Sequence, residues 1–220
     1  MIISARRIKK QISTYKAEVF IILLFLATRL INLNGLPIFN DEGIYLDWGW
    51  QEIHFKDNLY YSLFDGKQPM LMWAFGIFQY IFKDPLIAGR IISVITGFIT
   101  LAGIYLISRK ILNPRIAHLS SLLYVLIPIF IFFDRQALME SAMSSVGVWL
   151  FFFFILNISN PRKIYGILSG ILIGVGLFVK SNAFLFFVAF AVISFYAIYH
   201  SNESKFKLKF LISQAIGVVT

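Results

Sequence analysis

The sequence predicts an all-α fold, a polytopic bundle of transmembrane helices with a large outer loop that carries two interfacial helices. Of the 220 residues, 59% are apolar or aromatic and 14% are charged, whereas soluble domains average about 45–50% apolar and about 25% charged residues. The apolar residues form long runs, and about 20 helical residues cross a hydrocarbon core of about 30 Å. This composition excludes a soluble enzyme and a disordered chain, and the absence of cysteine excludes a disulfide scaffold.

The apolar runs give the expected membrane spans. They cover approximately residues 17–33, 91–108, 116–133, 141–158, 164–179, 183–200 and, in part, 210–220. Pro128 is expected to kink the third span, because proline removes a backbone hydrogen bond. The last run has only eleven residues, so we expect residues 1–220 to be the N-terminal transmembrane domain of a longer protein.

The N-terminal segment is predicted to be an uncleaved membrane anchor. Five bases precede its apolar run, namely Arg6, Arg7, Lys9, Lys10 and Lys16. A signal peptide has a similar basic start, but Arg29 interrupts this run and no small-residue cleavage site follows. Because bases concentrate on the cytoplasmic side, the N-terminus is expected in the cytoplasm of a multi-pass plasma-membrane protein.

Residues 34–90 are predicted to form one outer loop. Its apolar segment, residues 69–82, has 14 residues and would rise only about 21 Å as a helix. If this segment does not cross the membrane, thirteen of the twenty bases lie inside, whereas a crossing leaves only nine inside. The positive-inside rule therefore favours a loop that carries two short helices, near residues 43–55 and 69–82.

Charged residues on the outer side suggest a site for a phosphate-bearing lipid. Asp41 and Glu42 are adjacent in the outer loop, and Glu140 lies in the next outer connection. The bases expected on the same face are Lys67, Arg90, Arg135 and Lys180. Ionisable residues at the hydrocarbon edge usually line a functional cavity or pair with one another. Such cations would neutralise a leaving phosphate while a carboxylate accepts a proton from an incoming hydroxyl.

Five short motifs occur in a recognisable order along the chain. They are Asp41-Glu42-Gly43, Gly66-Lys67-Gln68-Pro69, Arg90 at the head of a span, Glu140, and a glycine-rich run that ends in Lys180. This order resembles the start of the GT-C membrane glycosyltransferases, in the branch of protein O-mannosyltransferases and aminoarabinose transferases. In this sequence Gln68 replaces a proline of the family motif, and Glu140 stands where aspartate is commoner. The resemblance extends from about Arg29 to Lys180.

The resemblance implies transfer of a sugar from a polyprenyl-phosphate donor to a hydroxyl of a glycan, lipid or protein at the outer membrane face, with inversion. By resemblance, Asp41 is the catalytic base, Glu42 a supporting carboxylate and Glu140 the second acidic site residue. The donor phosphate is assigned to Lys67, Arg90 and Lys180, with Arg135 as a further candidate. The implied partners are donor, acceptor and membrane lipids, in glycosylation of the cell envelope, and not nucleic acid. No cofactor is assigned: the histidines lack metal-ligand spacing, and a divalent cation is left open.

Two other functional classes stay open at this point. A transporter places its charges near the bilayer midplane, and the predicted spans hold almost no charge there, which favours chemistry at the membrane surface. A non-catalytic lipid-binding subunit would keep the fold without turnover. A simpler interpretation of the charges is that the carboxylates are solvated and the bases reach lipid phosphates.

Overall fold

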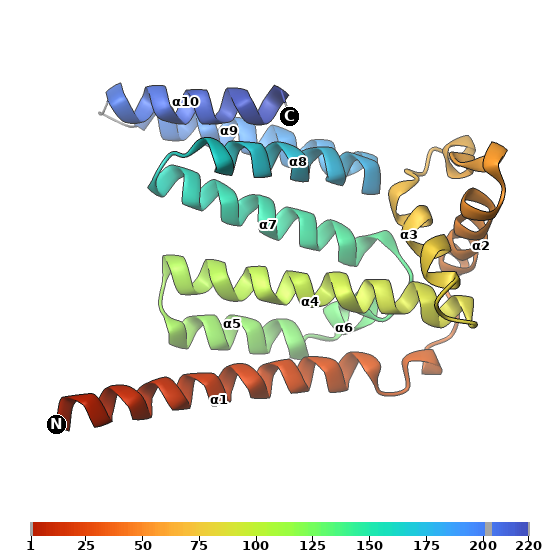
Figure 1. Cartoon of the computed structure of the whole chain (residues 1–220), viewed down its shortest axis with the longest axis horizontal. Helices are drawn as coiled ribbons and strands as arrows, with labels where there is room; N and C mark the ends of the chain where they lie inside the picture. The colour runs from red at the N-terminus through yellow and green to blue at the C-terminus, as the bar shows by residue number, and fades with distance from the viewer. Residues whose placement is uncertain (1, 201–203, 220) are drawn as a thin grey trace.

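A computed structural model describes the backbone of residues 2–200 and 204–219, and the side chains of residues 15–200, 206–217 and 219. The described chain contains ten α-helices and no strand, which confirms the predicted all-α fold. The longer helices lie side by side in a bundle (Figure 1): α1 (Ile2–Leu30), α4 (Pro85–Ile111), α5 (Pro114–Leu126), α7 (Met139–Ser159), α8 (Lys163–Val179), α9 (Phe184–His200) and α10 (Ser204–Val219). A short helix, α6 (Pro128–Asp134), follows α5.

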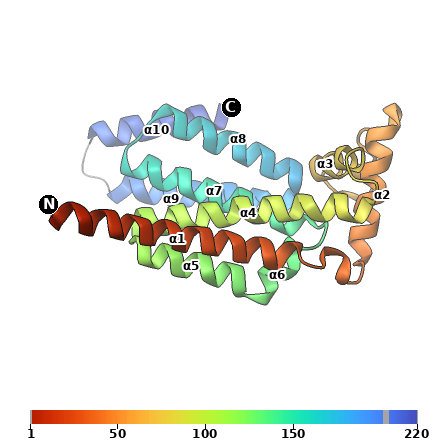
Figure 2. The same ribbon diagram turned by 60° about the horizontal axis from the view of Figure 1, so that its bottom comes forward.

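The segment between α1 and α4 forms a cap over one end of the bundle. It carries α2 (Asn40–His54) and α3 (Met70–Gln79), close to the two short helices expected from the sequence. Figures 1 and 2 both place this α2–α3 cap at the end of the bundle opposite the N-terminus of α1. The starts of α4 and α7 and the end of α8 lie at the same end as the cap (Figure 1).

Two glycines allow the cap helices to pack closely. A Cβ atom on Gly49 of α2 would lie 2.6 Å from the carbonyl oxygen of Met72, and one on Gly76 of α3 would lie 2.1 Å from the carbonyl oxygen of Gly49. Real Cβ atoms do not approach backbone this closely, so a larger residue at either position would separate the helices. Trp48 and Phe75 are buried in the core cluster around this contact.

Among the residues that the structure describes, three helical stretches are long and apolar enough to cross a membrane, namely α4, α7 and residues 181–200. A fourth candidate is the pair α5 and α6, whose axes differ by 67° at the break before Pro128. This break confirms the kink expected at Pro128. The sequence is therefore that of a polytopic helix bundle, as predicted.

Five of the thirteen bases expected in the cytoplasm lie in connections at the end of the bundle away from the cap. Arg109, Lys110 and Arg115 lie at the α4–α5 connection, and Arg162 and Lys163 lie at the α7–α8 connection. Both connections are at the uncapped end in Figure 1. The side chains of Arg6, Arg7, Lys9, Lys10 and Lys205 are outside the described residues.

Candidate active site

A buried ion pair joins the cap to the bundle. Glu42 lies in the first turn of α2 and Arg90 near the start of α4, and neither side chain is exposed. Arg90 donates from Nε and Nη2 to the two carboxylate oxygens of Glu42, each at 2.8 Å. A bidentate pair restricts orientation as well as distance. It therefore fixes α2 relative to α4.

The same ion pair also holds two connecting segments. Arg90 donates to three backbone carbonyls within residues 33–37, and Glu42 accepts from the backbone N–H groups of Phe39 and Ala137. The sequence assigns Glu42 to catalysis and Arg90 to the donor phosphate. In the structure they bind each other and the surrounding backbone, and both are buried.

Asp41 has different surroundings from its neighbour. It is partly exposed and lies one helical turn before Tyr45 on α2. Burial, followed by the charges of Asp41 and Glu140 and a hydrogen bond with Asp41, raises the pKa of Tyr45 to about 12. The phenol is thus protonated at neutral pH and donates to Asp41. The negative charges of Asp41 on α2 and Glu140 on α7 therefore both favour the protonated phenol.

Glu140 and Lys180 form a second, more accessible ion pair at the capped end. Glu140 lies in the first turn of α7, and Lys180 directly follows α8. The Lys180 Nζ lies 2.7 Å from Oε1 of Glu140, and the two side chains are 36% and 35% exposed. Pairs this exposed contribute about 0–1 kcal/mol. Lys180 can therefore exchange the carboxylate for another anion at little cost.

A hollow of about 420 Å³ opens beside this ion pair. Glu140, Lys180 and Asp134 contribute charged groups to its lining. Much of the remaining wall is apolar and comes from Ile129, Phe130, Phe133, Met143, Leu185 and Phe186. A charged rim beside an apolar wall suits a ligand in which a phosphate is joined to a hydrocarbon chain.

Lys67 follows a turn in the α2–α3 cap. Gly66 before it has φ 70°, a left-handed conformation that glycine adopts without strain. The Lys67 side chain is half-buried, and among the described residues its ammonium has no ion-pair partner. Asp65, two residues earlier, also raises the pKa of Tyr45. The turn therefore carries a cation that has no ion-pair partner among the described residues.

Arg135 has backbone partners. Its guanidinium donates to the carbonyls of Thr28, Ile31 and Asn32 at the C-terminal end of α1. The last carbonyls of a helix lack partners within the helix, so a nearby arginine can cap them. From the sequence, Arg135 is a candidate for binding the donor phosphate. In the structure, the hydrogen bonds of Arg135 attach the α6–α7 connection to α1.

Sequence reasoning missed a buried polar network that forms part of the wall of the hollow. Arg29 of α1 and Asp134 of α6 form an ion pair at 3.1 Å, with side chains 0% and 2% exposed. Tyr124 and Ser141 donate to the same carboxylate at 2.9–3.0 Å. The signal was present in the sequence, because charges inside membrane segments are usually paired within the bundle. The network joins α1, α5, α6 and α7 beneath the α6–α7 connection.

The histidines occupy separate places. The His54 ring stacks on Trp50, with centroids 3.3 Å apart, and also on Tyr80, while His118 packs against Tyr105. Within the part of the chain that the structure describes, no group of three or more His, Cys, Asp or Glu side chains is arranged to hold a metal ion.

One family model matches the chain. It describes dolichyl-phosphate-mannose-protein mannosyltransferases and matches residues 66–219, well over half of the sequence. No curated protein and no solved structure gives a significant match. The match includes α3 to α10 and the site residues Lys67, Glu140 and Lys180. The protein is thus a multi-pass membrane glycosyltransferase that uses a sugar donor linked to a lipid phosphate, and the chain belongs to the dolichyl-phosphate-mannose-protein mannosyltransferase family.

Proposed function

We propose that the protein transfers a sugar from a polyprenyl phosphate to an acceptor hydroxyl at the outer membrane face, with inversion at the anomeric carbon. The observation that carries this proposal is the Glu140–Lys180 ion pair on the lining of a largely apolar hollow, at the same end of the bundle as the first turn of α2, which contains Asp41 (Figure 1). The acceptor is a glycan, a lipid or a protein.

Asp41 is the proposed catalytic base. The acceptor oxygen attacks the anomeric carbon, the bond from that carbon to the phosphate oxygen breaks, and the hydroxyl proton moves to the Asp41 carboxylate. A base must lie within hydrogen-bond reach of the proton it accepts. Asp41 is the accessible member of the acidic pair and is oriented by Tyr45, whereas Glu42 is fully buried.

The donor phosphate is assigned to Lys180 and Lys67. Lys180 lines the hollow, and among the described residues its ammonium pairs with Glu140 alone, while Lys67 has no described ion-pair partner. Cations that face the leaving phosphate stabilise the charge that develops on it as the glycosidic bond breaks. The apolar wall of the hollow then holds the first isoprene units. Glu140 keeps Lys180 in place in the absence of donor.

Glu42, Arg90 and Arg135 are proposed as positioning residues. The Glu42–Arg90 pair holds the start of α2, which carries Asp41, against α4. Glu42 also binds the backbone of Ala137, two residues before α7, which carries Glu140. One buried carboxylate therefore helps to set the separation between Asp41 and Glu140.

The two lysines are expected to act on one ligand. Lys67→Gln and Lys180→Gln should each lower the rate at limiting donor by about tenfold or more, since each removes a charged hydrogen bond to phosphate. The double variant should lose less than the product of the two single losses, because both lysines share one phosphate. Transfer rates measured against donor concentration test this, with Lys110→Gln, at the uncapped end, as the control. Small, independent effects at both positions would contradict a shared phosphate site.

The cap is expected to lie on the outer side of the membrane. Single cysteines at the exposed cap positions Lys56 and Lys83 should react with an impermeant thiol reagent in intact cells, while a cysteine at Lys110 should react only after permeabilisation. The chain contains no native cysteine to interfere. Labelling of position 83 only in permeabilised cells would refute the outer loop.

A further inference from the structure

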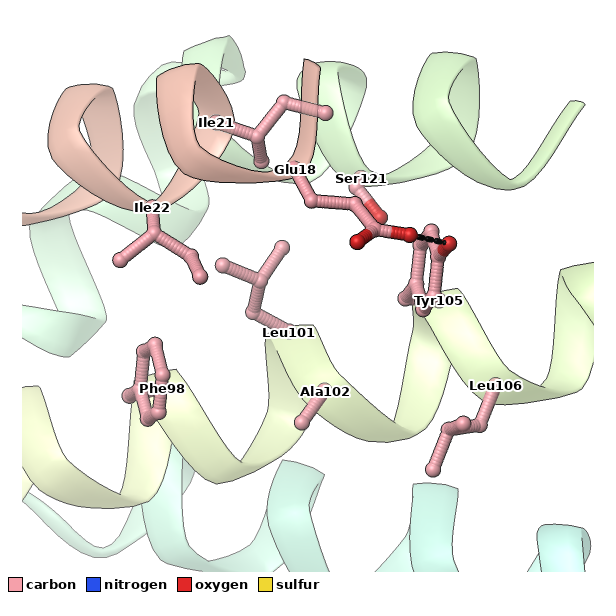
Figure 3. Close-up of a pocket in the computed structure, with 9 residues that line it drawn as sticks. All are labelled: Glu18, Ile21, Ile22, Phe98, Leu101, Ala102, Tyr105, Leu106 and Ser121. Carbon is pink, nitrogen blue, oxygen red and sulfur yellow. Dashed lines mark hydrogen bonds between the residues drawn. The ribbon is translucent and has the colours of Figure 1, made fainter. Parts of the chain in front are cut away.

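A second cavity lies in the half of the bundle away from the proposed active site. It has a volume of about 270 Å³ and is lined by residues of α1, α4 and α5. Figure 3 shows its lining, which runs along one stripe of α4 through Phe98, Leu101, Ala102 and Tyr105. Arg109 continues this stripe in the last turn of α4. Residues 98 and 109 are separated by about 16 Å along a helix, so the stripe extends from the middle of the helix to its end.

The cavity is polar at one side and apolar at the other (Figure 3). Glu18 accepts a hydrogen bond from the Tyr105 hydroxyl, and Arg109 donates to the same hydroxyl at 3.2 Å. Ile21 and Ile22 of α1 meet Phe98 and Leu101 of α4 in the apolar part (Figure 3). The polar side is therefore nearer the end of the bundle, and the apolar side is nearer its middle.

The two charged groups at the polar side, Arg109 and Glu18, do not form a direct hydrogen bond with each other. Arg109 Nη1 lies 3.8 Å from Oε1 of Glu18, which is longer than a direct charge-assisted hydrogen bond of about 2.7–2.9 Å. Arg109 is 54% and Glu18 24% exposed. Both groups can therefore accept a further polar partner.

A buried hydroxyl supplies an independent indication of a ligand. Ser121 of α5 lines the cavity, is 1% exposed, and its Oγ has no hydrogen-bond partner in the described structure. Buried hydroxyls without a partner are costly and uncommon in proteins. In Figure 3 its side chain lies beside Glu18 at the polar side of the cavity. An ester or hydroxyl group of a bound molecule would satisfy it.

We propose that this cavity binds a phospholipid with a phosphoethanolamine head group. The primary ammonium donates to Glu18, the phosphate accepts from Arg109, an ester carbonyl accepts from Ser121, and one acyl chain enters the apolar part. The polar-to-apolar order along the α4 stripe matches the order of head group, ester and chain in such a lipid. A free anion would leave the apolar part empty, and a choline head group has no N–H to donate to Glu18. The inference does not depend on the proposed transfer reaction.

Native mass spectrometry of the delipidated protein tests this proposal. Phosphatidylethanolamine, phosphatidylcholine and phosphatidylglycerol with identical acyl chains are titrated separately. The wild type should retain one phosphatidylethanolamine at about tenfold lower lipid concentration than the other two, as expected for one charged hydrogen bond. Glu18→Gln should reduce its binding to the level of phosphatidylcholine. Lys110→Gln, a change at the same end of α4 but outside the cavity lining, should have no effect.

A second variant tests the chain-binding part of the cavity. Ala102→Phe fills the apolar region and leaves Glu18, Arg109 and Ser121 intact, so it should abolish retention of all three lipids at the single site. It also provides the test if Glu18→Gln does not fold. Equal retention of the three lipids by the wild type, or unchanged retention by both variants, would overturn the proposal.

Discussion

Asp41→Asn is expected to lower turnover by about 10²- to 10⁴-fold, the usual effect of removing a general base. The asparagine has the same shape and can still accept a hydrogen bond from Tyr45, but it cannot accept the acceptor's proton. Donor binding should change little, because the proposed phosphate contacts come from Lys67 and Lys180. The rate of sugar transfer at saturating donor and acceptor measures this effect.

Asp47→Asn is the matched control for that experiment. Asp47 is an exposed carboxylate on the same helix, and its change should leave turnover within about twofold of the wild type, since exposed substitutions away from structural features have small effects. Near-normal turnover in Asp41→Asn would exclude Asp41 as the base and direct attention to Glu140, the other accessible acid near Tyr45.

Arg90→Leu is expected to destabilise the protein by about 3–5 kcal/mol, since it leaves the Glu42 carboxylate buried without a counter-charge. Three backbone carbonyls of residues 33–37 lose their donor at the same time. Thermal unfolding of the purified protein in detergent measures the loss. Activity should fall with stability, because the start of α2 is no longer held in place.

A double variant and a control distinguish the effect of breaking the buried ion pair on stability from the effect of losing a side chain. Glu42→Gln combined with Arg90→Leu should recover part of the stability, because no unpaired charge stays buried. Lys180→Met breaks an ion pair that is about one-third exposed and should cost no more than about 1 kcal/mol. If Arg90→Leu and Lys180→Met lower stability equally, the buried pair does not anchor the cap.

Much of the fold could be predicted because it depends on local patterns. Apolar runs located the bundle helices, Pro128 marked the break between α5 and α6, and charge distribution indicated that residues 69–82 stay at one end of the bundle. The end of the bundle that carries the site could also be predicted, because the order of the helices determines which helix ends lie on the same side. Asp41, Glu140 and Lys180 each lie next to a helix end on the same side of the bundle.

The different environments of Asp41 and Glu42 could not be predicted from the sequence. Consecutive residues of a helix point about 100° apart, and only the packing of α2 against α4 determines which one is buried. Arg29 and Asp134 illustrate the same limit, since they are 105 positions apart in the chain and meet only after α1 and α6 have packed. Such pairings arise from tertiary contacts, which a local pattern does not contain.

The most direct test of the central claim is donor consumption by the purified protein in proteoliposomes. Polyprenyl phosphates that carry radiolabelled hexoses or pentoses are supplied together with a panel of acceptors, which includes lipids, glycans and proteins. The wild type should convert at least one donor to free polyprenyl phosphate with label in an acceptor, and Asp41→Asn in the same membranes should convert it at least about 10²-fold more slowly. Equal donor conversion by wild type and Asp41→Asn would contradict the proposed site, and no conversion of any donor by a folded wild type would contradict the proposed reaction.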